Sequence, residues 1–298
     1  MRELLTPCVL CLWSMGTLAQ HDHGGAPPPV PSTGGQRPAM RAWTMQPLLL
    51  PAMARGGDRA AAMLRPMGIE ATEVQVSAAD GPVERRRVAY PVGPEGARIE
   101  AASPMVGNYH WLTARQESAA EVRVASSAWY FSNPGAAPTE LLKQARHELE
   151  IVPQPLPREH SGYRESEKWR FLVRWQGQPL GNQPLTLETE FGSRSRYLTD
   201  ETGIATVLFP RDMVPVGEGG AGPEGRGPRR AKFVLTTERT GDADGKRYLT
   251  AFNYSYAADP DRERSLAWGA AFGALGMVAA TPLLRRRAAK SNGENSHG

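Results

Sequence analysis

The sequence predicts an all-β protein with immunoglobulin-like β-sandwich domains, followed by a C-terminal transmembrane helix. Three observations carry this prediction. Apolar and polar residues alternate in many short runs, turn residues separate the runs, and one long uncharged segment lies near the C-terminus. Between the two ends, no stretch has the spacing of a long amphipathic helix, so an α/β fold is not expected.

The N-terminal segment has the features of a cleavable signal peptide. Residues 4–19 are apolar and follow Arg2, and they end in the small residues Thr17-Leu18-Ala19 before Gln20. An uncleaved membrane anchor is the alternative. The segment is short for a membrane span, however, and polar Gly/Pro-rich sequence follows at once, which favours cleavage.

The C-terminal segment predicts a single membrane span. Leu266 to Leu284 is nineteen residues without a charge, which crosses a hydrocarbon core of ~30 Å at ~1.5 Å per residue. Four basic residues within 285–290 mark the cytoplasmic side, so the bulk of the chain is expected in the periplasm, anchored to the cell inner membrane. Gly269 and Gly273 form a G-x-x-x-G, a spacing that can drive formation of a homodimer, although such small residues are also common in spans without a partner.

Composition divides the chain between its ends. The Gly/Pro-rich residues after the signal predict a flexible tether, with a short helix near Asp58 to Leu64. Alternating runs then begin near Glu73, and Ser132-Asn133-Pro134-Gly135 interrupts them. The predicted parts are a signal peptide (1–19), a tether (20–67), a first β block (68–137), an immunoglobulin-like β-sandwich (138–258), a transmembrane helix (266–284) and a cytoplasmic tail (285–298).

Alternation is clearest in the second β block, where each strand is expected to bury one face. About seven short strands in ~110 residues are typical of an immunoglobulin-like sandwich. Residues 199–203 (T-D-E-T-G) predict a turn before the strand at 204–209, and residues 240–245 predict a hairpin turn in preference to a calcium loop. The face expected in the core consists of Trp169, Phe171, Val173 and Trp175, with Lys168, Arg170 and Arg174 opposite.

Several functions are disfavoured by the residues. The net charge is +4 and the arginines are spread along the chain, so no nucleic-acid partner is expected. Cys8 and Cys11 lie in the signal peptide, which leaves the mature chain without thiols. His147-Glu148 begins an H-E-x-x-H zinc motif, but Ile151 replaces the second histidine. We therefore predict that the protein is not an enzyme.

Histidines near the new N-terminus predict a metal site. His21, Asp22 and His23 lie together beside the amine that signal cleavage releases. Imidazole, carboxylate and amine groups are suitable ligands for Ni²⁺, Co²⁺ or Cu²⁺. His110 is the additional ligand that we expect if the tail folds back. The alternative is a flexible polar tail that carries two histidines without a metal.

Four segments resemble a family of periplasmic domains whose members are often named as nickel or cobalt uptake components. They are residues 147–153 (H-E-L-E-I-V-P), 171–180 (F-L-V-R-W-Q-G-Q-P-L), 199–203 (T-D-x-x-G) and 110–112 (H-W-L). The similarity covers roughly residues 107–256. It implies a periplasmic β fold and a place beside a metal uptake transporter.

The sequence therefore predicts a membrane-anchored periplasmic protein that binds or hands on a transition metal, nickel/cobalt or copper, as an accessory of metal uptake. A non-catalytic β-sandwich interaction module of a membrane complex is the alternative, and it needs no metal. Metal titration of the mature region distinguishes the two.

Overall fold

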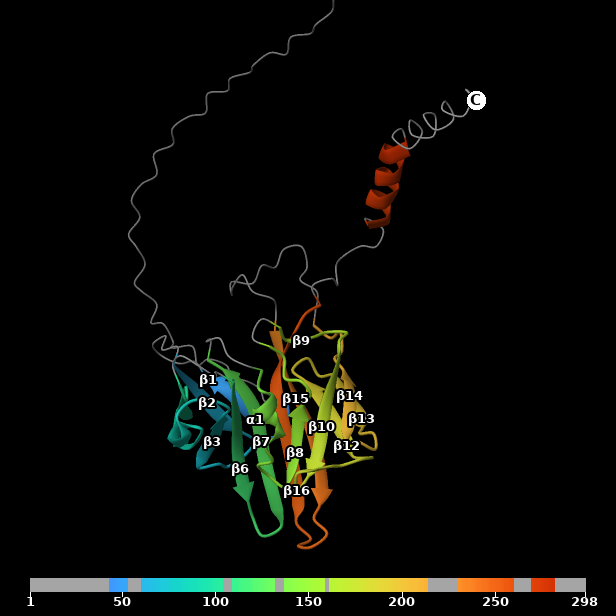
Figure 1. The fold of residues 1–298 in the computed structure, drawn as a ribbon. Helices are drawn as coiled ribbons and strands as arrows, with labels where there is room; N and C mark the ends of the chain where they lie inside the picture. The colour runs from blue at the N-terminus through green and yellow to red at the C-terminus, as the bar shows by residue number, and fades with distance from the viewer. Residues whose placement is uncertain are drawn as a thin grey trace, which may run out of the picture. The chain divides into compact units, whose positions relative to one another are not determined.

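The computed structural model describes most of the predicted β region and part of the predicted span. Strands make up nearly all of its regular structure, so the all-β class is confirmed (Figure 1). The predicted signal peptide and cytoplasmic tail lie outside the described residues. The described ranges are 43–52, 60–103, 109–131, 137–158, 161–213, 230–259 and 269–281.

One nine-stranded sheet runs through the molecule in the order β13-β12-β15-β16-β7-β6-β3-β4, with β9 pairing β16 off this path. All neighbours pair antiparallel except β16 with β7 and β16 with β9, which pair parallel. The strands are β3 (Glu73–Ala78), β4 (Arg87–Pro91), β6 (Tyr109–Glu117), β7 (Glu121–Tyr130), β9 (Tyr163–Arg164), β12 (Pro184–Thr189), β13 (Arg194–Leu198), β15 (Arg230–Thr240) and β16 (Arg247–Ala257).

Two smaller sheets cover opposite faces of this long sheet. One has the order β1-β2-β5, and the other joins β8, β10, β11 and β14. Their strands are β1 (Leu48–Ala52), β2 (Ala61–Met67), β5 (Ala97–Glu100), β8 (Leu149–Pro153), β10 (Lys168–Trp175), β11 (Gln178–Pro179) and β14 (Ile204–Leu208). On β6, Trp111 packs with the β8-β10-β14 side, while the next residue, Leu112, packs with the β1-β2-β5 side. The fold is therefore layered like a sandwich on both faces.

Central strands of the long sheet bury both faces, which differs from the single buried face that the alternation predicts. Phe233 and Leu235 of β15 belong to the core under β10, whereas Val234 between them packs against β1. A strand covered on both sides has no polar face to preserve, so strict alternation is not required of its sequence. The long sheet also continues across the predicted boundary at residues 137–138, because β16 pairs with β7.

The predicted core face of β10 is confirmed, but one residue of its polar face is not exposed. Phe171 and Val173 are fully buried, and Trp169 and Trp175 pack at the margin of the same core. Arg174 is buried as well. Its Nε donates to Glu150 on β8 at 2.8 Å, and its other nitrogens donate to backbone carbonyls at the end of α1 (Thr139–Lys143).

The predicted tether over residues 20–67 is wrong in its second half. Residues 48–52 and 61–67 form the paired strands β1 and β2, and the strand replaces the short helix predicted near Asp58 to Leu64. Leu49 packs toward β5 while Leu48 and Leu50 pack on β15 and β16, so the Leu48–Leu50 run is buried without alternation. Proline is tolerated here because β1 is an edge strand, which leaves one side of its backbone unpaired.

Both predicted turns of the second block are confirmed. Asp200 accepts hydrogen bonds at its Oδ1 from the backbone N–H groups of Thr202 and Ile204 at 2.9 and 3.0 Å, which closes the turn before β14. Gly203 has a φ of +74°, and a Cβ there would lie 2.8 Å from two backbone atoms, so only glycine fits. Residues 241–246 connect β15 and β16 as a hairpin turn.

Residues 269–281 form a helix whose large apolar side chains are exposed. It is the described part of the predicted span over 266–284. Among the described residues, no helix has the length and apolarity that crossing a membrane requires.

Candidate functional site

The structure places one of the four residues predicted to bind a metal. His110 on β6 is buried, and its Nε2 accepts a hydrogen bond from the backbone N–H of Ala102 at 2.9 Å. Its ring lies edge-on to Phe131, with 4.8 Å between ring centroids. His21, Asp22 and His23 lie outside the described residues. Within the described ranges, no group of three or more His, Cys, Asp or Glu side chains could hold a metal ion.

A more prominent feature is a fork in the long sheet between β7 and β16. The two strands pair from Arg247↔Glu121 to Phe252↔Ser126, and there the pairing ends. Both strands nevertheless continue, β7 with β6 and β16 with β15. Beyond the fork the short strand β9 takes the place of β7, pairing Tyr163 with Tyr256.

Side chains replace the backbone ladder at the base of the fork. The hydroxyl of Ser127 donates to the carbonyl of Asn253 at 2.8 Å, just past the last backbone pair. The side-chain amide of Asn253 is turned to β1 instead, where it both donates to and accepts from the backbone of Leu49 at 2.8 Å. The bonds to Leu49 hold β1 against the fork, and the bond from Ser127 joins the two arms at their base.

The fork opens into a groove with a cavity volume of about 570 Å³. Its walls come from residues 127–130 of β7, residues 253–258 at the end of β16, residues 157–158 and 161–164 around β9, and β1. Trp129, Tyr130 and Tyr254 give it an aromatic lining, and Leu50 and Leu64 add aliphatic surface. A volume of this size is in the range of ~300–1,000 Å³ that small-molecule sites occupy.

The charges of the groove all have one sign. Its described lining includes Arg158, Arg164, Arg230 and Lys232 and contains no Asp or Glu. Lys232 pairs with Glu190 at 3.0 Å, outside the lining. Arg164 and Arg230 are exposed and form no ion pair with any described residue. Two guanidinium groups therefore remain to attract an anion.

The groove also includes a buried polar group without a partner. Tyr163 is fully buried, and no described residue forms a hydrogen bond with its hydroxyl. Burial raises the pKa of this hydroxyl well above its usual range, so it stays a donor. A buried hydroxyl without a partner costs about 1–3 kcal/mol.

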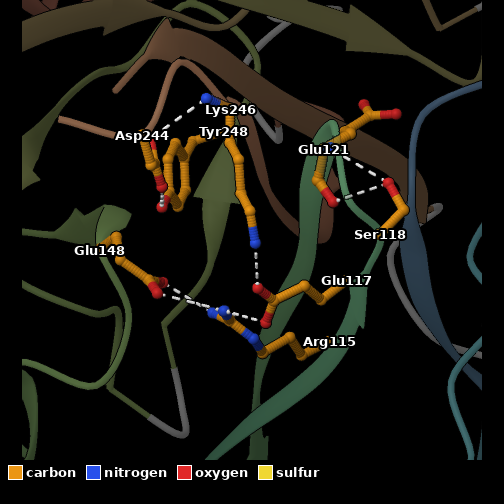
Figure 2. Close-up of polar contacts among 8 residues, drawn as sticks. All are labelled: Arg115, Glu117, Ser118, Glu121, Glu148, Asp244, Lys246 and Tyr248. Atoms are coloured by element: carbon orange, nitrogen blue, oxygen red, sulfur yellow. Dashed lines mark hydrogen bonds and ion pairs between the residues drawn. The ribbon is translucent and has the colours of Figure 1, made fainter. Parts of the chain in front are cut away.

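The opposite end of the β7–β16 junction carries a closed network of charges (Figure 2). Arg115 on β6 donates to Glu148 at 2.6 and 3.1 Å and to Glu117 at 2.8 Å, and Lys246 donates to Glu117 at 2.6 Å. Hydrogen bonds from Lys246 and Arg115 lower the pKa of Glu117 to about 2. The hydroxyl of Tyr248 donates to Asp244 at 2.6 Å. These partners satisfy one another across β6, the β15–β16 hairpin and the segment before β8.

His147 lies beside this network, at an open hollow of about 470 Å³ lined also by Arg115, Arg146 and Glu148. Burial and the nearby Arg115 lower the pKa of His147 to about 4. Its Nε2 has no hydrogen-bond partner in the described structure. Because Arg115 is already paired with two carboxylates, the hollow has less free charge to offer than the groove.

Sequence reasoning identified neither the groove nor two of the strands that line it, since β1 was placed in the tether and no strand was predicted at β9. The aromatic lining of the groove comes from strands of the two alternating blocks, because Trp129 and Tyr130 lie on β7 and Tyr254 lies on β16. The fork depends on where β16 stops pairing with a strand more than a hundred residues away.

Comparisons with known proteins leave the family open. No family model and no curated protein matches the sequence. Among solved structures, one similar chain comes from work described as "Structural insight into host cell surface retention of a 1.5-MDa bacterial ice-binding adhesin", at 11% identity and a TM-score of 0.24. The match covers 72% of this chain and 65% of that chain, so it spans less than two thirds of the other protein's length. A likeness at this level carries no argument for function.

Proposed function

We propose that this protein is a non-catalytic binding module that holds an anionic, partly apolar ligand in the groove between β7 and β16. The observation that carries the proposal is the fork itself. Two strands stop pairing at Phe252↔Ser126 and leave a cavity of about 570 Å³ with aromatic walls and two arginines, Arg164 and Arg230, that no described acid pairs. The described lining offers neither imidazole nor carboxylate, and its Lys232 is paired with Glu190, which supports binding over acid–base chemistry by these groups.

Placement at a membrane is the second part of this proposal. The uncharged segment 266–284 and the basic residues after it support a periplasmic module on a single inner-membrane span, within a membrane complex. The immunoglobulin-like topology predicted for residues 138–258 stays a prediction beside the confirmed all-β class.

An anionic naphthalene-sulfonate dye tests the proposal, because its aromatic rings and charge match the groove. The full chain in phosphatidylcholine nanodiscs should bind the dye at one saturable site, after subtraction of empty nanodiscs. Gly162 lines the groove, and a Cβ added there meets no heavy atom within 4 Å. Gly162→Trp should therefore fill the groove and abolish saturable binding without straining the backbone.

Gly93 provides the matched control, since an added Cβ would meet only one atom, at an ordinary 3.7 Å, in the turn between β4 and β5. Gly93→Trp should bind the dye as the wild type does. Equal binding by the Gly162→Trp and wild-type proteins would contradict a ligand site in the groove.

Transition-metal handling is a second proposal, and the observation that favours it is the His21-Asp22-His23 cluster in the sequence. Calorimetry with Ni²⁺, Co²⁺ and Cu²⁺ should detect binding that a His21→Ala/His23→Ala variant loses. Affinity should fall below the ordinary histidine pKa of ~6.5, because the ligating imidazoles must be neutral. Unchanged binding in the variant would remove the tail from the site.

A further inference from the structure

The residues that line the groove limit the class of ligand that it can bind. This inference rests on the proposed function. We propose that the groove binds an anionic membrane lipid with a single acyl chain, placing the head group at Arg164 and Arg230 and the chain along the aromatic and aliphatic wall. The protein would then be a lipid-binding module.

Charge complementarity selects an anionic head group. Arg164 and Arg230 lie at the ends of β9 and β15, two strands that flank β16, and no described acid neutralises either guanidinium. Guanidinium groups bind phosphate or carboxylate oxygens with paired hydrogen bonds. A neutral or zwitterionic head group would leave one or both arginines without a full counter-charge.

The rest of the lining selects an apolar body. Leu50, Leu64 and Trp129 face the cavity together with Tyr254, from four different strands. Each buried methylene is worth about 0.8 kcal/mol, which is close to fourfold in affinity. A free phosphate or a short polar anion would gain nothing from this surface, whereas an acyl chain would.

The position of the groove in the chain favours a lipid source. The groove includes the end of β16 at Ala257, and the predicted span begins at Leu266, nine residues later. A chain of that length separates the two points by at most ~32 Å. The site would then lie within reach of the outer surface of the membrane, which is a source of anionic lipid.

An extended peptide is the alternative occupant, and the backbone argues against it. A peptide that adds a strand needs a run of free edge. On β16 that edge is already occupied by β9 at Tyr256 and Ala257, and Ser127 ties β7 to Asn253 at the base of the fork. The unpaired edge of β7 is confined to residues 127–130.

Native mass spectrometry of the full chain, released from phosphatidylcholine nanodiscs, tests this proposal. Discs doped with lysophosphatidylglycerol should give a one-to-one adduct, and discs doped with lysophosphatidylcholine should not. Affinity should rise by up to about fourfold per added methylene until the cavity is full. Arg164→Gln/Arg230→Gln should weaken the adduct at least about tenfold, since each lost charged hydrogen bond is worth about that much.

The control for charge is Arg194→Gln/Arg196→Gln on β13, which removes the same charge from exposed arginines outside the groove lining. It should keep the adduct. Equal adducts with the two head groups, or unchanged adducts in the Arg164→Gln/Arg230→Gln variant, would overturn the lipid proposal. If the wild-type protein binds the dye but forms no lipid adduct, the lipid proposal is overturned and the groove remains a ligand site. If it neither binds the dye nor forms an adduct, the proposed function is overturned as well. A co-purifying peptide displaced by the dye would identify the alternative occupant.

Discussion

The two ends of the β7–β16 junction use their charged residues in opposite ways. At the hairpin end, which we call the closed end, the strands pair, and Arg115 and Lys246 form hydrogen bonds with their carboxylate partners. At the fork the strands separate, and Arg164 and Arg230 have no described acid beside them. Charges that are paired with one another have little attraction left for a ligand, whereas unpaired cations beside an apolar cavity can bind an anion. The same sheet is thus structural at one end and suited to binding at the other.

The largest expected effect is at the closed end, where Arg174 and Glu150 are buried together. Glu150→Ala leaves a buried guanidinium without its carboxylate, so the free energy of unfolding should fall by about 3–5 kcal/mol. Urea denaturation measures it. A Glu150→Leu/Arg174→Met variant should recover only part of the loss, because Arg174 also donates to the carbonyls of Lys143 and Gln144. A loss under about 1 kcal/mol for Glu150→Ala would show that the pair does not hold this end closed.

The next effect is a dependence on pH through His147, also at the closed end. Its folded pKa of about 4 lies below its unfolded value of 6.5, so the unfolded state takes up the proton first. Stability should be full above pH 6.5 and should fall by about 1–2 kcal/mol between pH 7.5 and pH 5. Urea titrations at both pH values, with His147→Gln as control, measure this. If the stability of His147→Gln depends on pH as the wild type's does, the pH dependence comes from groups other than His147.

A smaller effect, of opposite sign, is expected at the fork. Tyr163→Phe removes a buried hydroxyl that has no partner among the described residues, so the ligand-free protein should gain about 1 kcal/mol of stability. Thermal or urea unfolding measures the gain. A clear loss of stability would mean that the hydroxyl is satisfied without a ligand.

The smallest effect concerns the exposed part of the closed network. Two hydrogen bonds lower the pKa of Glu117, and the one from Lys246 lowers it most. Lys246→Met removes that bond, so the pKa of Glu117 should rise from about 2 toward its ordinary 4.5. Carboxyl-carbon NMR titration follows it. Dye binding in the groove should not change, and a change would mean that the two ends are coupled.

Local patterns predicted much of the fold and little of the site. Alternation around Phe171 and the turn chemistry of Asp200 and Gly203 are encoded by neighbours in sequence, and both were found as expected. The Leu48–Leu50 run was missed because a strand covered on both faces carries no alternation. The fork could not be predicted, because the point where β16 leaves β7 depends on Ser127 and Asn253, residues far apart in the chain.

The measurement that most directly tests the central claim is hydrogen–deuterium exchange of the full chain in nanodiscs, with and without the naphthalene-sulfonate dye. A ligand in the groove should slow amide exchange in residues 127–130 and 253–257, because it covers the arms of the fork. Residues 115–121 and 244–248 at the closed end should exchange as before. Protection at the closed end, or none at the fork, would contradict the assignment of the groove as the binding site.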